Sequence, residues 1–137
     1  MTQAEEIKET LIGKQITRIE QKDDFQVEVT LDDGVILTLT GNEGGCYCGN
    51  GDWTITKLLA DSEKPRARIM NARVDDRIAV DEDYGDIHGP ITVFIMAEGR
   101  EYPLVEFSGY DNGWYGHGFY CSVSQIQSPD RTCTITL

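Results

Sequence analysis

Two short glycine-rich segments hold most of the residues that could do chemistry in this chain. The first segment, 41–53, contains the closely spaced Cys46 and Cys48, and the second, 109–120, contains His117. Glycine is favoured where the backbone must turn sharply or approach another group closely. Aromatic side chains within such segments indicate a surface shaped for recognition. We therefore expect the functional region in these two segments, provided that the fold brings them together.

The cysteine pair of the first segment has three interpretations. A catalytic cysteine needs a thiol pKa lowered by a histidine or a helix N-terminus, and the surroundings here are mostly acidic. Cys46, Cys48 and Asp52 could bind a transition metal, together with His117 if it lies nearby. The four cysteines Cys46, Cys48, Cys121 and Cys133 could also form a zinc site, but structural zinc sites usually pair their ligands as C-x2-C or wider, which this spacing matches poorly. In the third interpretation, the glycines shape a tight loop and the cysteines pack as small apolar residues. The sequence predicts no catalytic residue and no cofactor, with zinc as the alternative.

The second segment carries consecutive aromatic residues behind a turn signal. Asn112-Gly113 predicts a tight turn that would present Trp114 and Tyr115 at a loop tip. Such rings anchor protein partners and stack on flat ligands. Alternatively the rings fold back on the sheet, although two consecutive side chains cannot both point inward from an extended strand. The candidate ligand- or partner-binding residues of both segments are Cys46, Tyr47, Cys48, Asn50, Asp52, Trp53, Asp111, Asn112, Trp114, Tyr115 and His117.

Charge and hydrophobicity narrow the class of protein. Twelve basic and twenty-four acidic residues give a net charge of −12, which disfavours binding to nucleic acid. The partners that fit are basic protein surfaces, cations or neutral small molecules. The apolar runs are too short to span a bilayer, and residues 1–6 lack the apolar core of a secretory signal. We therefore expect a cytoplasmic protein whose thiols stay reduced.

The N-terminal residues predict the one helix. Thr2 and Glu5 have capping-box spacing, Ile7 and Leu11 share a face, and Gly13 can end the helix in a left-handed conformation. A helix of this length is marginal alone and must dock on an apolar surface.

The remaining chain favours strands. Strict alternation on both sides of Asp33-Gly34 predicts a hairpin with a type I′ turn. Further strands are expected at 53–59, 66–74, 91–96, 102–107 and 119–123, and after a turn at 128–130. Segment 91–96 is apolar on both faces and should lie centrally in the sheet. Segment 75–89 carries six acidic residues and is expected to be an exposed loop interrupted by Ile78 and Val80. Its residues 81–86 lack the full ligand series and the terminal glutamate of an EF-hand, which favours a solvated charged loop over a calcium site.

These elements predict a single domain, 1–137, of the α+β class and mainly β. The N-terminal helix should pack on an antiparallel sheet of about seven to nine strands, because no spacer has room for a crossover helix. Whether the sheet is open, two-layered or partly barrelled is left open by the pattern.

Three stretches resemble an uncharacterised family of small bacteriophage proteins, especially from phages of actinobacteria. They are Leu11-Ile12-Gly13-Lys14-Gln15-Ile16, Gly44-Gly45-Cys46-Tyr47-Cys48 with Gly51-Asp52-Trp53, and Phe107-Ser108-Gly109-Tyr110-Asp111-Asn112-Gly113-Trp114-Tyr115-Gly116. The resemblance runs from about Leu11 to Val123 and implies a phage context and a fold, but no activity.

The hypothesis from the sequence is a small, cytoplasmic, non-enzymatic binding protein made by a phage. It would act on a host protein or sequester a small ligand through loops 46–53 and 111–117. The alternative is a metal-binding protein or a cysteine-dependent enzyme centred on Cys46, Cys48 and His117.

Overall fold

The computed structural model describes residues 2–45, 47–81, 85–112 and 115–125. These residues form one α-helix, α1 (Gln3–Leu11), one 3-10 helix, η1 (Asp61–Glu63), and eleven strands. The strands are β1 (Ile16–Gln21), β2 (Gln26–Leu31), β3 (Val35–Gly41), β4 (Thr54–Leu58), β5 (Asn71–Asp76), β6 (Ala79–Val80), β7 (Ile87–His88), β8 (Ile91–Ala97), β9 (Arg100–Ser108), β10 (Tyr110–Asp111) and β11 (Phe119–Gln125). The α+β, mainly β class expected from the sequence is confirmed.

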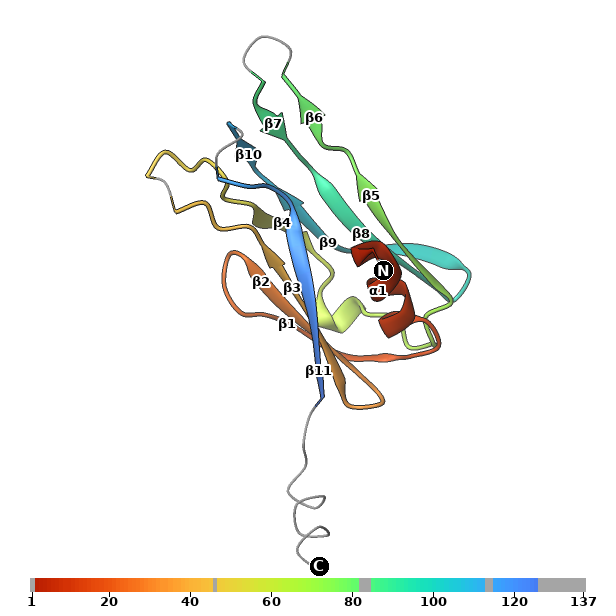
Figure 1. The fold of residues 1–137 in the computed structure, drawn as a ribbon. Helices are drawn as coiled ribbons and strands as arrows, with labels where there is room; N and C mark the ends of the chain where they lie inside the picture. The colour runs from red at the N-terminus through yellow and green to blue at the C-terminus, as the bar shows by residue number, and fades with distance from the viewer. Residues whose placement is uncertain (1, 46, 82–84, 113–114, 126–137) are drawn as a thin grey trace, which may run out of the picture.

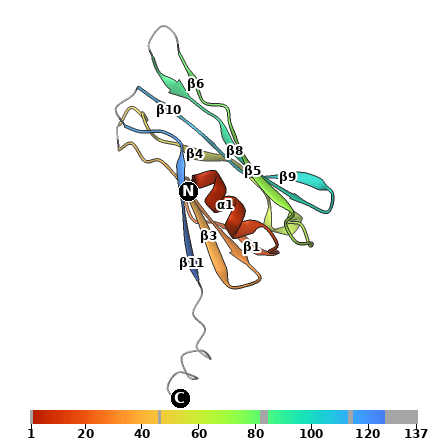
Figure 2. The ribbon, with the colours of Figure 1, turned by 45° about the vertical axis from the view of Figure 1, so that its right-hand side comes forward.

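Two four-stranded antiparallel sheets form the body of the molecule. Sheet A has the order β1-β2-β3-β11, and sheet B has the order β4-β9-β8-β5. The two sheets lie in separate layers, and α1 contacts the edge strands β5 and β11 on one side of the pair (Figures 1 and 2). The buried apolar side chains of both sheets and of the helix form one cluster. The arrangement that the sequence left open is therefore two-layered.

The helix has the ends and the buried face that the sequence predicts. Thr2 accepts the backbone N–H of Glu5, and the Glu5 side chain accepts that of Thr2, which completes the capping box. Ile7 and Leu11 are completely buried. Gly13 has a φ of +82°, and its N–H donates to the carbonyl of Ile69, so the chain leaves the helix toward β5.

The hairpin of β2 and β3 is confirmed, but its turn differs from the expected type I′. Gly34 has a φ of +85°, whereas Asp33 is not among the residues with a positive φ. A type I′ turn needs a positive φ at both central residues. The Gly34 N–H instead donates to the carbonyl of Leu31. The turn therefore covers residues 31–34, one residue earlier in the chain than the expected turn centred on Asp33-Gly34.

A third, small sheet extends sheet B toward one end of the molecule. Its strand order is β10-β7-β6. In the chain, β10 follows β9, β7 precedes β8 and β6 follows β5, so the small sheet has the same strand order as the β9-β8-β5 part of sheet B. The three short strands lie beyond the ends of their longer neighbours (Figure 1). The expectation of a solvated loop at 75–89 is therefore wrong in part, because β6 and β7 pair within it. The strand expected at 66–74 begins only at Asn71.

The strand expected to lie centrally does so. β8 pairs with β9 on one side and with β5 on the other, and most of its residues are buried. The turn expected at 128–130 and the strand after it lie outside the described residues.

Candidate functional site

The two glycine-rich segments meet at the end of the molecule where the small sheet lies. The Asn42 side-chain amide donates to the carbonyls of Gly51 at 2.8 Å and of Tyr115 at 2.7 Å. The Gly51 N–H donates to the carbonyl of Tyr110, and the Asn42 N–H donates to that of Gly118. Residues 41–53 and 109–118 are called the junction below. Because two of these bonds join backbone to backbone and the Asn42 side chain bonds to both segments, the described residues of the junction are held together before any partner binds.

Trp53 forms the base of the junction and is not on its surface. Its side chain is 0% exposed, so the expectation that this ring contacts a ligand or partner is corrected. Three glycines allow the burial: a Cβ on Gly41 would lie 1.7 Å from the Trp53 carbonyl oxygen, and one on Gly89 would lie 2.6 Å from the indole. A Cβ on Gly109 would lie 2.3 Å from the carbonyl oxygen of Asp52. These glycines are therefore needed for close packing around the ring.

The indole N–H of Trp53 has no hydrogen-bond acceptor among the described residues. A buried donor without an acceptor costs about 1–3 kcal/mol. The ring centroid of His117 lies 6.2 Å from that of Trp53. Burying the indole N–H in this way lowers the stability of the fold, and the apolar packing around Trp53 must offset that loss.

Asp111 and His117 form a carboxylate–imidazole pair on the junction. Asp111 is 2% exposed, and its Oδ1 accepts the backbone N–H of Tyr115 at 3.0 Å. Its Oδ2 lies 3.9 Å from Nδ1 of His117, whose side chain is 44% exposed. This distance is too long for a hydrogen bond, so the carboxylate attracts a protonated imidazole without fixing the orientation of a neutral one. The first role of Asp111 is to hold the backbone at Tyr115.

Side-chain hydrogen bonds fix the loop at 47–52. The Asp52 carboxylate accepts the backbone N–H of Gly44, and the Tyr110 hydroxyl donates to the carbonyl of Cys48. The Asn50 amide donates to the Cys48 sulfur at 3.0 Å. Cys48 is disulfide-bonded, so the expectation that all thiols are reduced is wrong for this residue. In this state Cys48 has no thiolate to act as a nucleophile or metal ligand. Cys121, by contrast, is a free thiol packed against the core, as expected for a small apolar residue.

Three tyrosines provide the exposed aromatic surface of the junction. Tyr47 is fully exposed, and Tyr110 and Tyr115 are 38% and 40% exposed. Tyr110 also stacks on His88 of β7, with ring centroids 6.3 Å apart. The sequence analysis did not select Tyr110 or His88, because their partnership depends on the pairing of β10 with β7. The signal that could have found Tyr110 is its place beside Gly109 in the second segment.

Two residues of the predicted site, Cys46 and Trp114, lie outside the described residues. Asn112 is described and is exposed. Among the residues that the structure describes, no group of three or more His, Cys, Asp or Glu side chains could hold a metal ion. No helix within the described ranges is long and apolar enough to cross a membrane.

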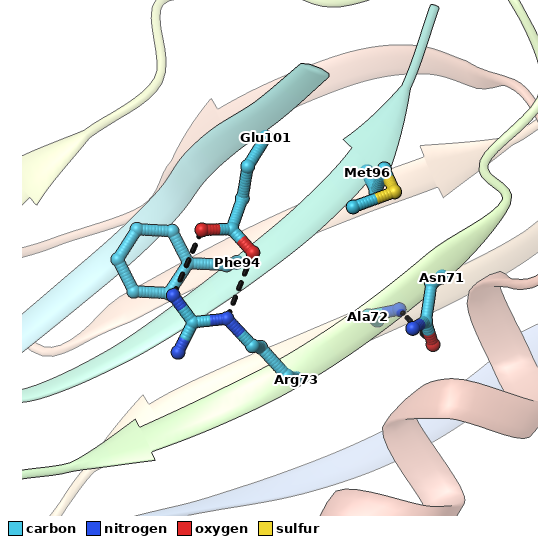
Figure 3. Close-up of a pocket in the computed structure, with 6 residues that line it drawn as sticks. All are labelled: Asn71, Ala72, Arg73, Phe94, Met96 and Glu101. Atoms are coloured by element: carbon cyan, nitrogen blue, oxygen red, sulfur yellow. Dashed lines mark hydrogen bonds and ion pairs between the residues drawn. The ribbon is translucent and has the colours of Figure 1, made fainter. Parts of the chain in front are cut away.

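A second polar surface lies on the outer face of sheet B. The Arg73 guanidinium reaches across β8 to form two hydrogen bonds with the Glu101 carboxylate and lies 4.2 Å from the centre of the Phe94 ring (Figure 3). A groove of about 280 Å³, lined by both apolar and charged residues, adjoins this cluster at Phe94. Its lining residues are Lys57, Asp75, Arg77, Pro90, Thr92, Phe94, Pro103 and Glu106.

The charges of this outer face are paired with one another. Hydrogen bonding by Arg73 lowers the pKa of Glu101 below its usual range, and Glu101 in turn raises the pKa of Arg73. Arg77 bonds Asp75 at 2.9 Å, and Lys57 lies 3.9 Å from Glu106. Side chains that already have partners of opposite charge offer little to a charged ligand, so the junction is the stronger candidate site.

No curated protein matches the chain. No solved structure matches it either. The segment that contains the junction does fall within a known family model, which is described as a domain of unknown function (DUF7448) and matches residues 9–121. The match begins inside α1 and ends in β11, so it includes all of sheet B, most of sheet A and both halves of the junction. With most of its length in this match, the chain belongs to the DUF7448 family.

Proposed function

We propose that this chain is a small phage-encoded binding protein without catalytic activity, which uses the junction to bind a host protein in the host cytoplasm. The observation that carries the proposal is the set of exposed rings, Tyr47, Tyr110 and Tyr115, on a backbone held by hydrogen bonds between the two segments. The phage context comes from the resemblance described above.

The chemistry of tyrosine supports a partner-binding role. A tyrosine ring offers a large contact area and a polar hydroxyl, and only two side-chain torsions must be fixed on binding. Because the loops are already held together, little further ordering is needed when the partner docks. The rings are carried by separate parts of the junction, which suits an extended protein surface better than a small enclosed ligand.

Site-directed photo-crosslinking tests the proposal. A photoreactive phenylalanine analogue placed at Tyr47 or Tyr115 should crosslink one host protein, which mass spectrometry identifies. The control is the same analogue at Met96, which lies at the far end of β8 and is exposed to a similar degree as Tyr115. The purified partner should then bind the unmodified chain and bind Tyr47→Ala/Tyr115→Ala at least about tenfold more weakly.

Two results would refute the proposal. One is equal crosslinking from all three positions, which would indicate non-specific contact. The other is unchanged affinity of the purified partner for the double tyrosine variant, provided that this variant keeps its melting temperature.

A further inference from the structure

The pair of Glu106 and Lys57 is the loosest ion pair on the outer face of sheet B. Glu101 and Asp75 each accept a hydrogen bond from an arginine, at 2.7 and 2.9 Å. Lys57 Nζ lies 3.9 Å from the Glu106 carboxylate, which is too far for a hydrogen bond. The Glu106 side chain is also the least exposed of the three carboxylates, at 17%. This carboxylate is therefore largely withdrawn from water, with its cationic partner held only loosely.

The register of sheet B explains the position of Glu106. Lys57 lies opposite Glu106 on β4, where a β-bulge makes Thr56 an extra residue, and Thr92 lies opposite Glu106 on β8. Both threonine hydroxyls donate to the carboxylate, at 2.9 Å from Thr56 and at 3.4 Å from Thr92. An ionised carboxylate has about four acceptor sites. The two hydroxyls therefore orient Glu106 and leave it able to accept a further donor.

Apolar surface lies beside this carboxylate. The groove of about 280 Å³ that Glu106 lines is also lined by Phe94, Pro103 and Pro90. Phe94 and Pro103 lie opposite each other on β8 and β9, in the row next to Thr92 and Glu106. Pro103 is exposed, and Phe94 and Pro90 are half-buried. An oriented charge beside apolar side chains is the composition of a site for a small organic molecule, and this volume suits a ligand of about one ring.

We infer that this groove binds a small organic amine, whose ammonium group donates to Glu106 and whose apolar body packs on Phe94 and Pro103. An ammonium group has three donors and no acceptor, and its bonds to a carboxylate are charge-assisted. The net charge of −12 attracts such a cation. Lys57 is 74% exposed, so its ammonium group moves into water at little cost when the ligand enters. This site is separate from the junction and does not rest on the proposed function.

A titration followed by two-dimensional amide NMR tests the inference. The probe is 2-phenylethylamine, and the comparison is 2-phenylethanol, which has nearly the same shape but no charge. The amine should shift the amide signals of Thr92, Phe94 and Glu106, leave those of α1 unchanged, and bind at least about tenfold more tightly than the alcohol. Equal binding of the two probes, shifts spread over the whole chain, or the absence of saturable shifts would overturn the inference.

Two variants with the same change of charge sharpen the test. Glu106→Gln should weaken binding of the amine about tenfold, because a neutral amide loses the charge-assisted bond. Glu101→Gln removes a carboxylate from the same face but outside the groove, so it should change the affinity less than about threefold. Equal losses in the two variants would mean that only the charge of the face matters and would refute the inference.

A third variant keeps the test decisive if Glu106→Gln folds poorly. Lys57→Met removes the cation that faces Glu106 and competes with the ligand for it. This variant should therefore bind 2-phenylethylamine about threefold more tightly than the unmodified chain. A loss of affinity would mean that Lys57 contributes to the site, which contradicts the inferred mode of binding.

A further probe separates a free amine from a lysine side chain of a protein partner. N-acetyl-lysine amide carries the same ammonium group on a narrow stem, which covers less of Phe94 and Pro103 than a ring does. It should bind at least about threefold more weakly than 2-phenylethylamine. Tighter binding of the lysine compound would assign the groove to a protein partner and overturn the inference.

Discussion

The junction and the outer face of sheet B are both polar surfaces that include aromatic rings, but their charged side chains differ in how they are paired. On sheet B, Arg73 bonds Glu101 through two contacts above the Phe94 ring, and the other charges of the face are also paired. At the junction, Asp52 and Asp111 bond to backbone N–H groups, and Glu43 has no ion-pair partner in the part of the chain that the structure describes. The two segments contain no lysine or arginine.

Under the proposed function, this difference in charge pairing gives the two surfaces different roles. Ion pairs on an exposed sheet face contribute little to stability, and they leave little charge for a partner to satisfy. Tyrosines and unpaired carboxylates on a pre-formed backbone gain favourable contacts only when a partner supplies them. The comparison can be tested by changing one surface at a time.

The largest effect is expected at the base of the junction. Trp53→Ala should lower the free energy of unfolding by about 4 kcal/mol, because the ring is completely buried. Trp53→Phe should cost less than half as much, since it also removes an indole N–H that has no acceptor among the described residues. Urea denaturation of both variants measures this. Equal losses would mean that the N–H is satisfied in solution.

The next effect is expected at Gly41. Gly41→Ala should cost about 3 kcal/mol, since the new Cβ would lie 1.7 Å from a carbonyl oxygen of Trp53. Gly45→Ala is the control in the same loop: its φ is +76° but no atom lies within 4 Å of the added Cβ, so the cost should be about 1 kcal/mol. Similar small costs at both positions would show that the chain does not pack tightly around Trp53.

A smaller effect is expected on the outer face of sheet B. Arg73→Gln, Glu101→Gln and the double variant should each lower the melting temperature only slightly, because both side chains are solvent-exposed. None of the three should change the affinity for the crosslinked host protein. A loss of affinity comparable with that of the tyrosine variant would remove the distinction between the two surfaces.

The smallest effect concerns Cys121, which lies in neither surface. Burial, and then the nearby Glu6 carboxylate, raise the pKa of the Cys121 thiol to about 11 from 9.0. The thiol should therefore react slowly with iodoacetamide at pH 8 in the folded chain and quickly in urea. The unfolded chain loses this proton first, so its contribution to stability is complete below pH 9 and is lost as the pH rises through about 11. Fast labelling of the folded chain at pH 8 would contradict this.

The sequence predicts the elements whose signals are local. The capping box of Thr2 and Glu5 and the alternation of β2 and β3 both concern neighbours in the chain, so α1 and the hairpin were correctly expected. The small sheet could not be predicted, because strands of two residues have no measurable period. β6 and β7 form there only because their longer neighbours β5 and β8 are already paired.

The site shows the same limit. The glycine and aromatic content of the two segments predicted that they could form one region, and the bonds of Asn42 join them. The burial of Trp53 depends on Gly41, Gly89 and Gly109, which come from three separate parts of the chain. No local pattern contains that information. For the same reason the stacking of Tyr110 on His88 became visible only in the structure.

The position of α1 has a consequence for how the chain is made. The Gln3 side chain bonds to the carbonyl of Phe119, 116 positions later, and the helix rests on β11 as well as β5. A ribosome therefore releases the helix long before its second docking strand exists. Until that strand emerges, Ile7 and Leu11 can be covered on one side only. The nascent chain then exposes an apolar surface that a chaperone could bind.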